Sequence, residues 1–190
     1  MIAAAQILSL SGFCVIGALP LLYFRRGEFN IRWWATAVPF FVTPLAVLAV
    51  GCGWLAPAVD STTVRTLLSA ASLLPGFLGI ALIERTVKAH RTRPALWHQE
   101  DDEPPAIVRW GPYRRIRHPF YAAFLLIFVS AALAAPHWLV WSGLGYTLAM
   151  LNLTAAREER RLLAGGHGPD YRSYMAVAGR FLPRFSGVSG

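Results

Sequence analysis

Apolar segments of membrane-spanning length alternate with charged segments along this chain. Five of them contain no Asp, Glu, Lys or Arg, and they cover residues 2–24, 33–56, 66–83, 119–135 and 138–156. A helix needs about 20 apolar residues, in a range of about 17–25, to cross the hydrocarbon core of a bilayer. The pattern therefore predicts an all-α, multi-pass integral membrane protein with about five transmembrane helices.

The last two apolar segments predict a helical hairpin. Only Pro136 and His137 separate them, and a proline inside a helix costs about 3 kcal/mol. A tight turn is therefore favoured over the alternative, one long helix kinked at Pro136. Segment 119–135 would rise about 25 Å, short of the roughly 30 Å core, so it need not span fully.

The distribution of basic residues predicts the orientation. The chain has 18 Lys and Arg against 10 Asp and Glu, a formal net charge of +8. A five-span topology places 17 of the 18 on one side and only Arg65 on the other. Loops rich in Lys and Arg stay in the cytoplasm. We therefore expect a multi-pass protein of the cell membrane, typical of a bacterial inner membrane, with the N-terminus outside and the C-terminus inside. Topology accounts for the charge, so no nucleic-acid partner is expected.

Composition narrows the class further. Charged residues make up 15% of the 190 residues, against about 25% in soluble domains, and the mean hydropathy is +0.45. These values exclude a disordered chain, a coiled coil and a disulfide scaffold. Cys14 and Cys52 have no Cys or His partner at metal-ligand spacing, so we expect them to be small apolar packing residues.

Two other patterns resemble sites but have simpler explanations. Residues 51–56 fit G-x-G-x-x-A, yet that motif needs a preceding strand and a following helix to bind a dinucleotide, and it lies here at the end of a span. Residues 98–103 collect one His and four carboxylates. No regular spacing organises them as ligands, so an acidic loop is favoured and no metal is expected.

The strongest candidate site precedes the fourth span. Residues 110–121 read Trp-Gly-Pro-Tyr-Arg-Arg-Ile-Arg-His-Pro-Phe-Tyr. Pro119 suits the first turn of a helix, which places Arg117 and His118 at a helix N-terminus, a favourable place for an anion. Membrane anchoring by snorkelling arginines is the alternative. It does not explain the Gly-Pro-Tyr and Arg-His-Pro-x-Tyr patterns.

A second candidate region follows the fifth span. Asn152 and Glu159 share a helix face by their i, i+7 spacing. The adjacent carboxylates Glu158 and Glu159 at the end of a membrane helix are costly unless cations meet them. Ion pairs with the flanking arginines are the simple alternative, above all for Glu158.

A short amphipathic cytoplasmic helix is expected after this region. Pro169 and Asp170 signal its start and Gly179 its end. Tyr171 and Tyr174 would lie on it and could cover a planar ring.

Four motifs now stand in order: Gly-Pro-Tyr with Arg-His-Pro-x-Tyr, Glu-Glu-x-x-Leu, Gly-x-x-Tyr-x-x-Tyr, and Arg-Phe-Leu-Pro. Together they resemble the isoprenylcysteine carboxyl methyltransferase family. The match covers about residues 110–185, the last 40% of the chain. The sequence departs from the family's pattern at Ala123, where the family has Gly, and at His167, where it has Phe.

The resemblance implies that the protein binds S-adenosylmethionine on the cytoplasmic side and methylates a lipophilic acceptor from the bilayer. Glu159, or Glu158, would meet the cofactor's ammonium, Arg117 and His118 would meet its carboxylate, and Arg180 would hold or polarise the acceptor. The predicted cofactor-binding residues are Tyr113, Arg117, His118, Pro119, Tyr121, Glu159, Tyr171 and Tyr174, and the predicted catalytic residues are Arg180 and Glu158.

Two other functions remain open. NADPH-dependent sterol or enone reductases resemble this sequence in Arg-His-Pro-x-Tyr, but they are usually longer and carry Asn where this chain has Phe120. A non-enzymatic scaffold or small transporter subunit is the third possibility. The spans hold no charge pair of the kind an ion path needs, which disfavours transport.

These elements make one membrane domain over residues 1–190. It comprises three spans in 1–84, a cytoplasmic loop in 85–117, the hairpin in 118–156 and a cofactor-binding segment in 157–190. The acceptor, whose identity stays open, is expected to enter sideways from the bilayer. The prolines of the second span and the short hairpin predict a gap between helices, lined by Phe40, Phe41, Phe120 and Phe124.

Overall fold

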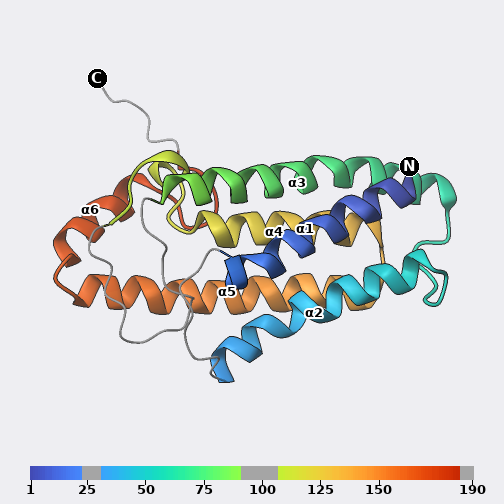
Figure 1. Cartoon of the computed structure of the whole chain (residues 1–190), viewed down its shortest axis with the longest axis horizontal. Coiled ribbons are helices and arrows are strands. Elements are labelled where there is room, and N and C mark those ends of the chain that lie inside the picture. The colour runs from blue at the N-terminus through green and yellow to red at the C-terminus, as the bar shows by residue number, and fades with distance from the viewer. Residues whose placement is uncertain (23–30, 91–106, 185–190) are drawn as a thin grey trace.

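The computed structural model describes residues 1–22, 31–90 and 107–184, and within these ranges the chain is helical, with one isolated β-bridge. In Figure 1 the helices of the bundle lie side by side, and the last helix lies at the end opposite the N-terminus. This architecture confirms the expected all-α fold. The elements are α1 (Ile2–Leu22), α2 (Ile31–Gly51), α3 (Thr62–Ala89), a 3₁₀ turn η1 (Gly111–Arg114), α4 (Pro119–Ala134), α5 (Trp138–Ala164) and α6 (Gly168–Val177).

Four helices, α1, α2, α3 and α5, are long and apolar enough to cross a membrane. Helix α4 has 16 residues and rises about 24 Å, less than the roughly 30 Å of the hydrocarbon core. It contacts all four of the others, and most of its residues are buried. The short fourth helix is thus the centre of the bundle, covered by protein on most sides.

Three helix ends differ from the sequence expectation. Helix α2 ends at Gly51 rather than at residue 56, because the chain then turns through Gly53, whose φ is +74°. Helices α3 and α5 run beyond their apolar segments, to Ala89 and Ala164. A charged residue ends the apolar pattern but does not end a helix.

The predicted hairpin between α4 and α5 is confirmed. His137 accepts a hydrogen bond from the Leu139 N–H on its Nδ1 at 3.2 Å, which caps the start of α5. The Pro136 carbonyl accepts from the Ala58 N–H at 2.7 Å. The turn is therefore fastened to the connection between α2 and α3.

The predicted gap lined by phenylalanines is not present at those residues. Phe40 and Phe124 pack edge to face with ring centroids 5.5 Å apart, and Phe120 is buried as well. Phe41 faces outward and is 54% exposed. The proline-bearing helix α2 still packs against α4, so the rings of Phe40, Phe120 and Phe124 fill the core instead of lining an entrance.

Close contacts between small and branched residues hold α1, α3 and α4 together. A Cβ added at Gly79 of α3 would lie 2.8 Å from Ile127 Cγ1 and 3.0 Å from the Ala123 carbonyl oxygen. A Cβ at Gly12 of α1 would lie 2.9 Å from Ile127 Cγ2. Such small-residue packing is typical of helices in lipid.

The expectation that the two cysteines pack inside was wrong. Cys14 and Cys52 are both exposed. Cys14 lies on an exposed face of α1, and Cys52 lies in the turn after α2.

Candidate functional site

Two segments that are distant in sequence pair side by side at the end of the bundle that carries α6. The Arg117 N–H donates to the Gly179 carbonyl at 2.7 Å, the Gly179 N–H to the Arg115 carbonyl at 3.0 Å, and the His118 N–H to the Arg180 carbonyl at 3.1 Å. A Cβ at position 179 would overlap a carbonyl oxygen of the following turn, so only glycine fits there. The pairing places Arg180 next to Arg117 and His118.

Glu159 lies at the centre of these cations. Its side chain, 4% exposed, receives Arg117 Nη2 at 2.9 Å, Arg180 Nη2 at 2.5 Å and His118 Nε2 at 3.3 Å. Arg180 also donates from Nη1 to Asn152 Oδ1 at 2.7 Å, which confirms that Asn152 and Glu159 share a face. A buried carboxylate is tolerable only when it is paired and hydrogen-bonded in this way.

His118 lies between two carboxylates. Its Nδ1 is 3.4 Å from Glu158 Oε2 and its Nε2 is 3.3 Å from Glu159 Oε1. Burial by itself lowers the pKa of His118, but hydrogen bonds and charge from both carboxylates outweigh it, and the net pKa is raised. Only the imidazolium can donate from both ring nitrogens, so the geometry favours a protonated His118.

Glu158 differs from its neighbour in its surroundings. Its Oε1 accepts from the Tyr121 hydroxyl at 2.6 Å, and the Tyr121 ring stacks on His118 with centroids 5.4 Å apart. The Glu158 side chain remains 22% exposed and lines a cavity. Glu158 is therefore oriented by protein contacts yet still accessible.

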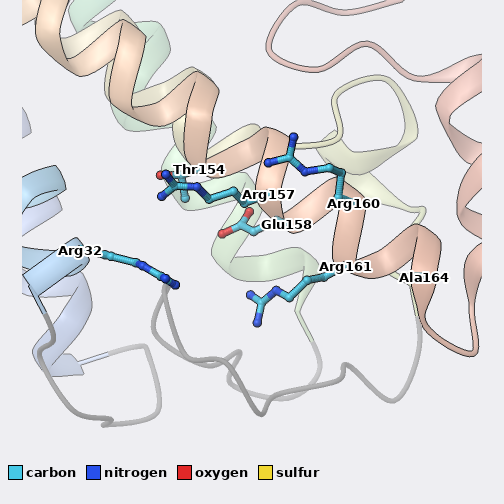
Figure 2. A pocket seen from close by; sticks show the side chains of 7 residues that line it. All are labelled: Arg32, Thr154, Arg157, Glu158, Arg160, Arg161 and Ala164. Carbon is cyan, nitrogen blue, oxygen red and sulfur yellow. The ribbon is translucent and has the colours of Figure 1, made fainter.

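The cavity beside Glu158 is rich in arginine. Its volume is about 490 Å³, within the usual range for ligand pockets of about 300–1,000 Å³. Figure 2 shows Arg32 reaching from α2 toward the side chains of α5. The described residues that line this cavity are Arg32, Thr154, Arg157, Glu158, Arg160, Arg161 and Ala164.

Helix α6 is attached to the segment before α4 through Tyr174. The Tyr174 hydroxyl donates to the Tyr113 carbonyl at 2.5 Å, and the Tyr113 hydroxyl lies 2.8 Å from His90 Nε2. Burial raises the pKa of Tyr174 to about 12, although Arg117 opposes the shift. Tyr171 and Tyr174 are both buried, so packing beneath the site is the role that their positions support.

A second cavity, of about 520 Å³, lies between α3, α4 and the Arg-Phe-Leu-Pro segment. Its lining is almost wholly apolar, with Arg85 as the charged exception. The Phe181 ring that borders it also contacts the His118 ring, at a centroid distance of 6.3 Å. Sequence reasoning missed this cavity, because its lining comes from outward faces of α3 and α4 that no motif marks.

The structure brings most of the predicted site residues into one cluster. Arg117, His118, Tyr121, Glu158, Glu159 and Arg180 are linked by the contacts above. Pro119 is the buried first residue of α4, and Tyr113, Tyr171 and Tyr174 lie beneath the cluster. The predicted alternative for Glu159, ion pairs with its flanking arginines, is not what the structure has, because its cations are Arg117 and Arg180.

Sequence reasoning also missed Arg32 as a neighbour of Glu158, since nothing in the sequence relates α2 to the end of α5. Among the described residues no three His, Cys, Asp or Glu side chains are grouped as metal ligands. The acidic segment 98–103 lies outside these residues.

Comparison with known proteins adds no identification. No family model matches the sequence, and no curated protein matches it significantly. The family resemblance therefore rests on the short motifs alone.

Proposed function

We propose that this chain is an integral-membrane methyltransferase that transfers a methyl group from S-adenosylmethionine to a lipophilic acceptor. One observation carries the proposal. The four motifs of the resemblance are spread over the last 40% of the chain, yet their charged and aromatic residues contact one another at one end of the helical bundle. Charged residues that served only as separate surface charges would not need to contact one another at one place.

The charges of the cluster fit the amino-acid end of the cofactor, which carries one ammonium and one carboxylate. Glu158 lines a cavity, so we assign it to the ammonium. Glu159 is already surrounded by Arg117, Arg180 and His118, so we assign it a positioning role. This reverses the sequence-based order, in which Glu159 came first.

Arg180 is the more accessible of the two guanidiniums on Glu159. Its side chain is 33% exposed, against 9% for Arg117, so it is the one that can also reach a carboxylate of the cofactor or the acceptor. The bound cofactor supplies an activated methyl group on a sulfonium. The chain's own residues then need to hold the acceptor atom in line and to keep water away from it.

The apolar cavity between α3 and α4 suits the tail of a lipophilic acceptor. It borders Phe181, the residue next to Arg180, so a tail in the cavity would bring the polar head toward the cluster. This route replaces the gap that the phenylalanines of the core were expected to line.

We also propose that the end carrying the cluster is cytoplasmic. The basic residues at the end of α5 and in the segment before α4 lie toward the α6 end. Arg65 lies in the first turn of α3, and α3 begins at the other end of the bundle (Figure 1). The positive-inside rule places the basic end in the cytoplasm, where the polar cofactor is available.

The decisive experiment is calorimetric titration of the detergent-purified protein with S-adenosylhomocysteine and, separately, with NADPH. We expect the first to bind. Glu158→Gln should weaken this binding by about 1.5–3 kcal/mol, the value of a hydrogen bond to a charged group. Glu84→Gln is the matched control, because it removes an exposed carboxylate that pairs with Lys88 on α3. Equal affinities of both variants and the parent would reject the assignment of Glu158.

The alternative function, an NADPH-dependent reductase, is favoured by one observation. Four of the seven residues that line the cavity beside Glu158 are arginines, and arginine clusters recognise phosphate. Binding of NADPH without S-adenosylhomocysteine in the same titration would select the reductase.

A further inference from the structure

The arginine-lined cavity is built by one stripe of α5 and the start of α2. Thr154, Arg157, Glu158 and Arg161 follow the i, i+3, i+4, i+7 spacing of a single helix face, and all four line the cavity. In Figure 2 the Arg32 side chain extends from α2 toward this stripe. Two helices that are far apart in sequence thus direct their cationic side chains at one volume.

The polar groups of this cavity suit an anion. Among the described residues, the lining has four guanidinium groups and one carboxylate, and that carboxylate is held by the Tyr121 hydroxyl and by His118. Thr154 also lines the cavity. Thr154 is 2% exposed, and its Oγ1 has no hydrogen-bond partner in the described part of the chain. A buried polar atom of this kind indicates a missing partner, and a phosphate oxygen would accept its hydrogen bond.

The cavity lies at the level where the apolar surface of both helices begins. Arg32 is followed directly by Trp33 and Trp34, and Trp34 is 49% exposed. On α5, Leu153 precedes Thr154 and is also 49% exposed. Exposed tryptophan and leucine beside cationic groups are typical of the boundary between headgroups and acyl chains. A ligand here would meet guanidinium groups at one end and apolar surface at the other.

We propose that this cavity binds the phosphate of an anionic phospholipid, with the acyl chains along the apolar surface of α2 and α5. Basic pockets between membrane helices at the cytoplasmic face suit such headgroups. The phosphate forms charge-assisted hydrogen bonds with Arg157, Arg161 and Arg32. This cavity also borders Glu158, which the proposed function assigns to the cofactor's ammonium. Loss of lipid binding therefore tests this inference, whereas loss of S-adenosylhomocysteine binding tests the proposed function.

The test compares lipid binding to two double variants of the detergent-purified protein by native mass spectrometry. Arg157→Gln/Arg161→Gln removes two charges from the cavity. Arg114→Gln/Arg172→Gln removes two charges from the same end of the bundle but outside the cavity. The probe is dioleoylphosphatidylglycerol, with dioleoylphosphatidylcholine as the zwitterionic lipid of equal chain length.

We expect the parent protein to retain phosphatidylglycerol more tightly than phosphatidylcholine. The cavity variant should lose at least about tenfold in phosphatidylglycerol affinity, while the control variant should lose severalfold less. General attraction of basic residues to an anionic surface contributes about equally for each arginine, so equal losses in the two variants would overturn the proposal. Equal retention of both lipids would overturn it as well.

A soluble phosphate is the other source of the same chemistry, and the same measurement distinguishes it. Inorganic phosphate and NADPH are added as competitors at fixed lipid concentration. We expect neither to displace the lipid. Displacement by NADPH that the cavity variant abolishes would assign the cavity to a nucleotide and overturn the lipid assignment. Thermal unfolding of each variant checks that it is folded.

Discussion

The charged end of the bundle and its apolar middle are held together by different forces. At the charged end, Glu159 of α5 joins Arg117 and His118 from one segment and Arg180 from another through hydrogen-bonded ion pairs. In the middle, α3 and α4 meet through the close approach of Gly79 to Ile127. In lipid, burial of apolar surface does not drive helices together, so close packing of complementary helix surfaces must hold α3 and α4 together. We therefore expect the stability of the charged end to depend on its ion pairs and on pH. The stability of the membrane-spanning part should depend on how closely its helices pack.

The largest effect is expected at the charged end. Glu159→Gln leaves two guanidiniums and an imidazolium without their shared buried counter-charge, and breaking such a pair costs about 3–5 kcal/mol. The midpoint of thermal unfolding in detergent should fall by about 10 °C, at about 2–4 °C for each kcal/mol in a chain of this size.

Glu158→Gln is the control for that prediction, because the neighbouring carboxylate is partly exposed. Its stability loss should be below about 1 kcal/mol, while its loss of cofactor affinity is the larger of the two effects. A midpoint shift of similar size in both variants would contradict the distinction between them.

The next effect tests the apolar middle. Gly79→Ala would push a methyl group against Ile127 and the Ala123 carbonyl, and overpacking of this kind costs about 1–3 kcal/mol. Gly17→Ala is the control, since a Cβ at Gly17 meets nothing within 4 Å. Thermal unfolding should show a lower midpoint for Gly79→Ala at every pH. A shift that depends on pH, or one shared by Gly17→Ala, would reject this account.

The third prediction separates the regions by pH. The folded-state pKa of His118 is raised, so the stability that it contributes is fully present below the unfolded value of about 6.5 and is lost as pH rises through the folded pKa. The midpoint difference between the parent and His118→Gln should therefore be largest near pH 6 and shrink toward pH 9. His167→Gln, at the same end but outside the cluster, should show a difference that does not change in this way.

The smallest effect concerns the attachment of α6. Tyr174→Phe removes the hydrogen bond to the Tyr113 carbonyl and should cost about 0.5–1.5 kcal/mol. Tyr171→Phe is the control, because the Tyr171 ring is about as buried as that of Tyr174. Within the described residues the Tyr171 hydroxyl makes no hydrogen bond, so removing it should cost less stability. Protection of the α6 amides from hydrogen exchange is the appropriate measurement, and equal protection in the two variants would argue against the attachment.

The sequence alone predicted the helical class, the hairpin and the short fourth helix, because apolar length and proline positions are local properties. Arg117, His118, Glu159 and Arg180 stand in recognisable motifs, which marked them as candidates, and the structure brings them into contact. The sequence misplaced the ends of α2, α3 and α5, because helix ends depend on capping and on the next contact rather than on where the apolar pattern stops.

Only the tertiary structure decided which of the two adjacent carboxylates is buried. Glu158 and Glu159 are adjacent and chemically identical, and no local pattern says which one is buried. The pairing of Gly179 with Arg115 and Arg117 brings Arg180 onto Glu159 and leaves Glu158 at the cavity. The same holds for the apolar cavity and for Arg32 beside α5, because both depend on which helix faces meet. Apolar length encodes that a helix crosses a membrane, but the fit of small residues between helices decides which of its faces is turned inward.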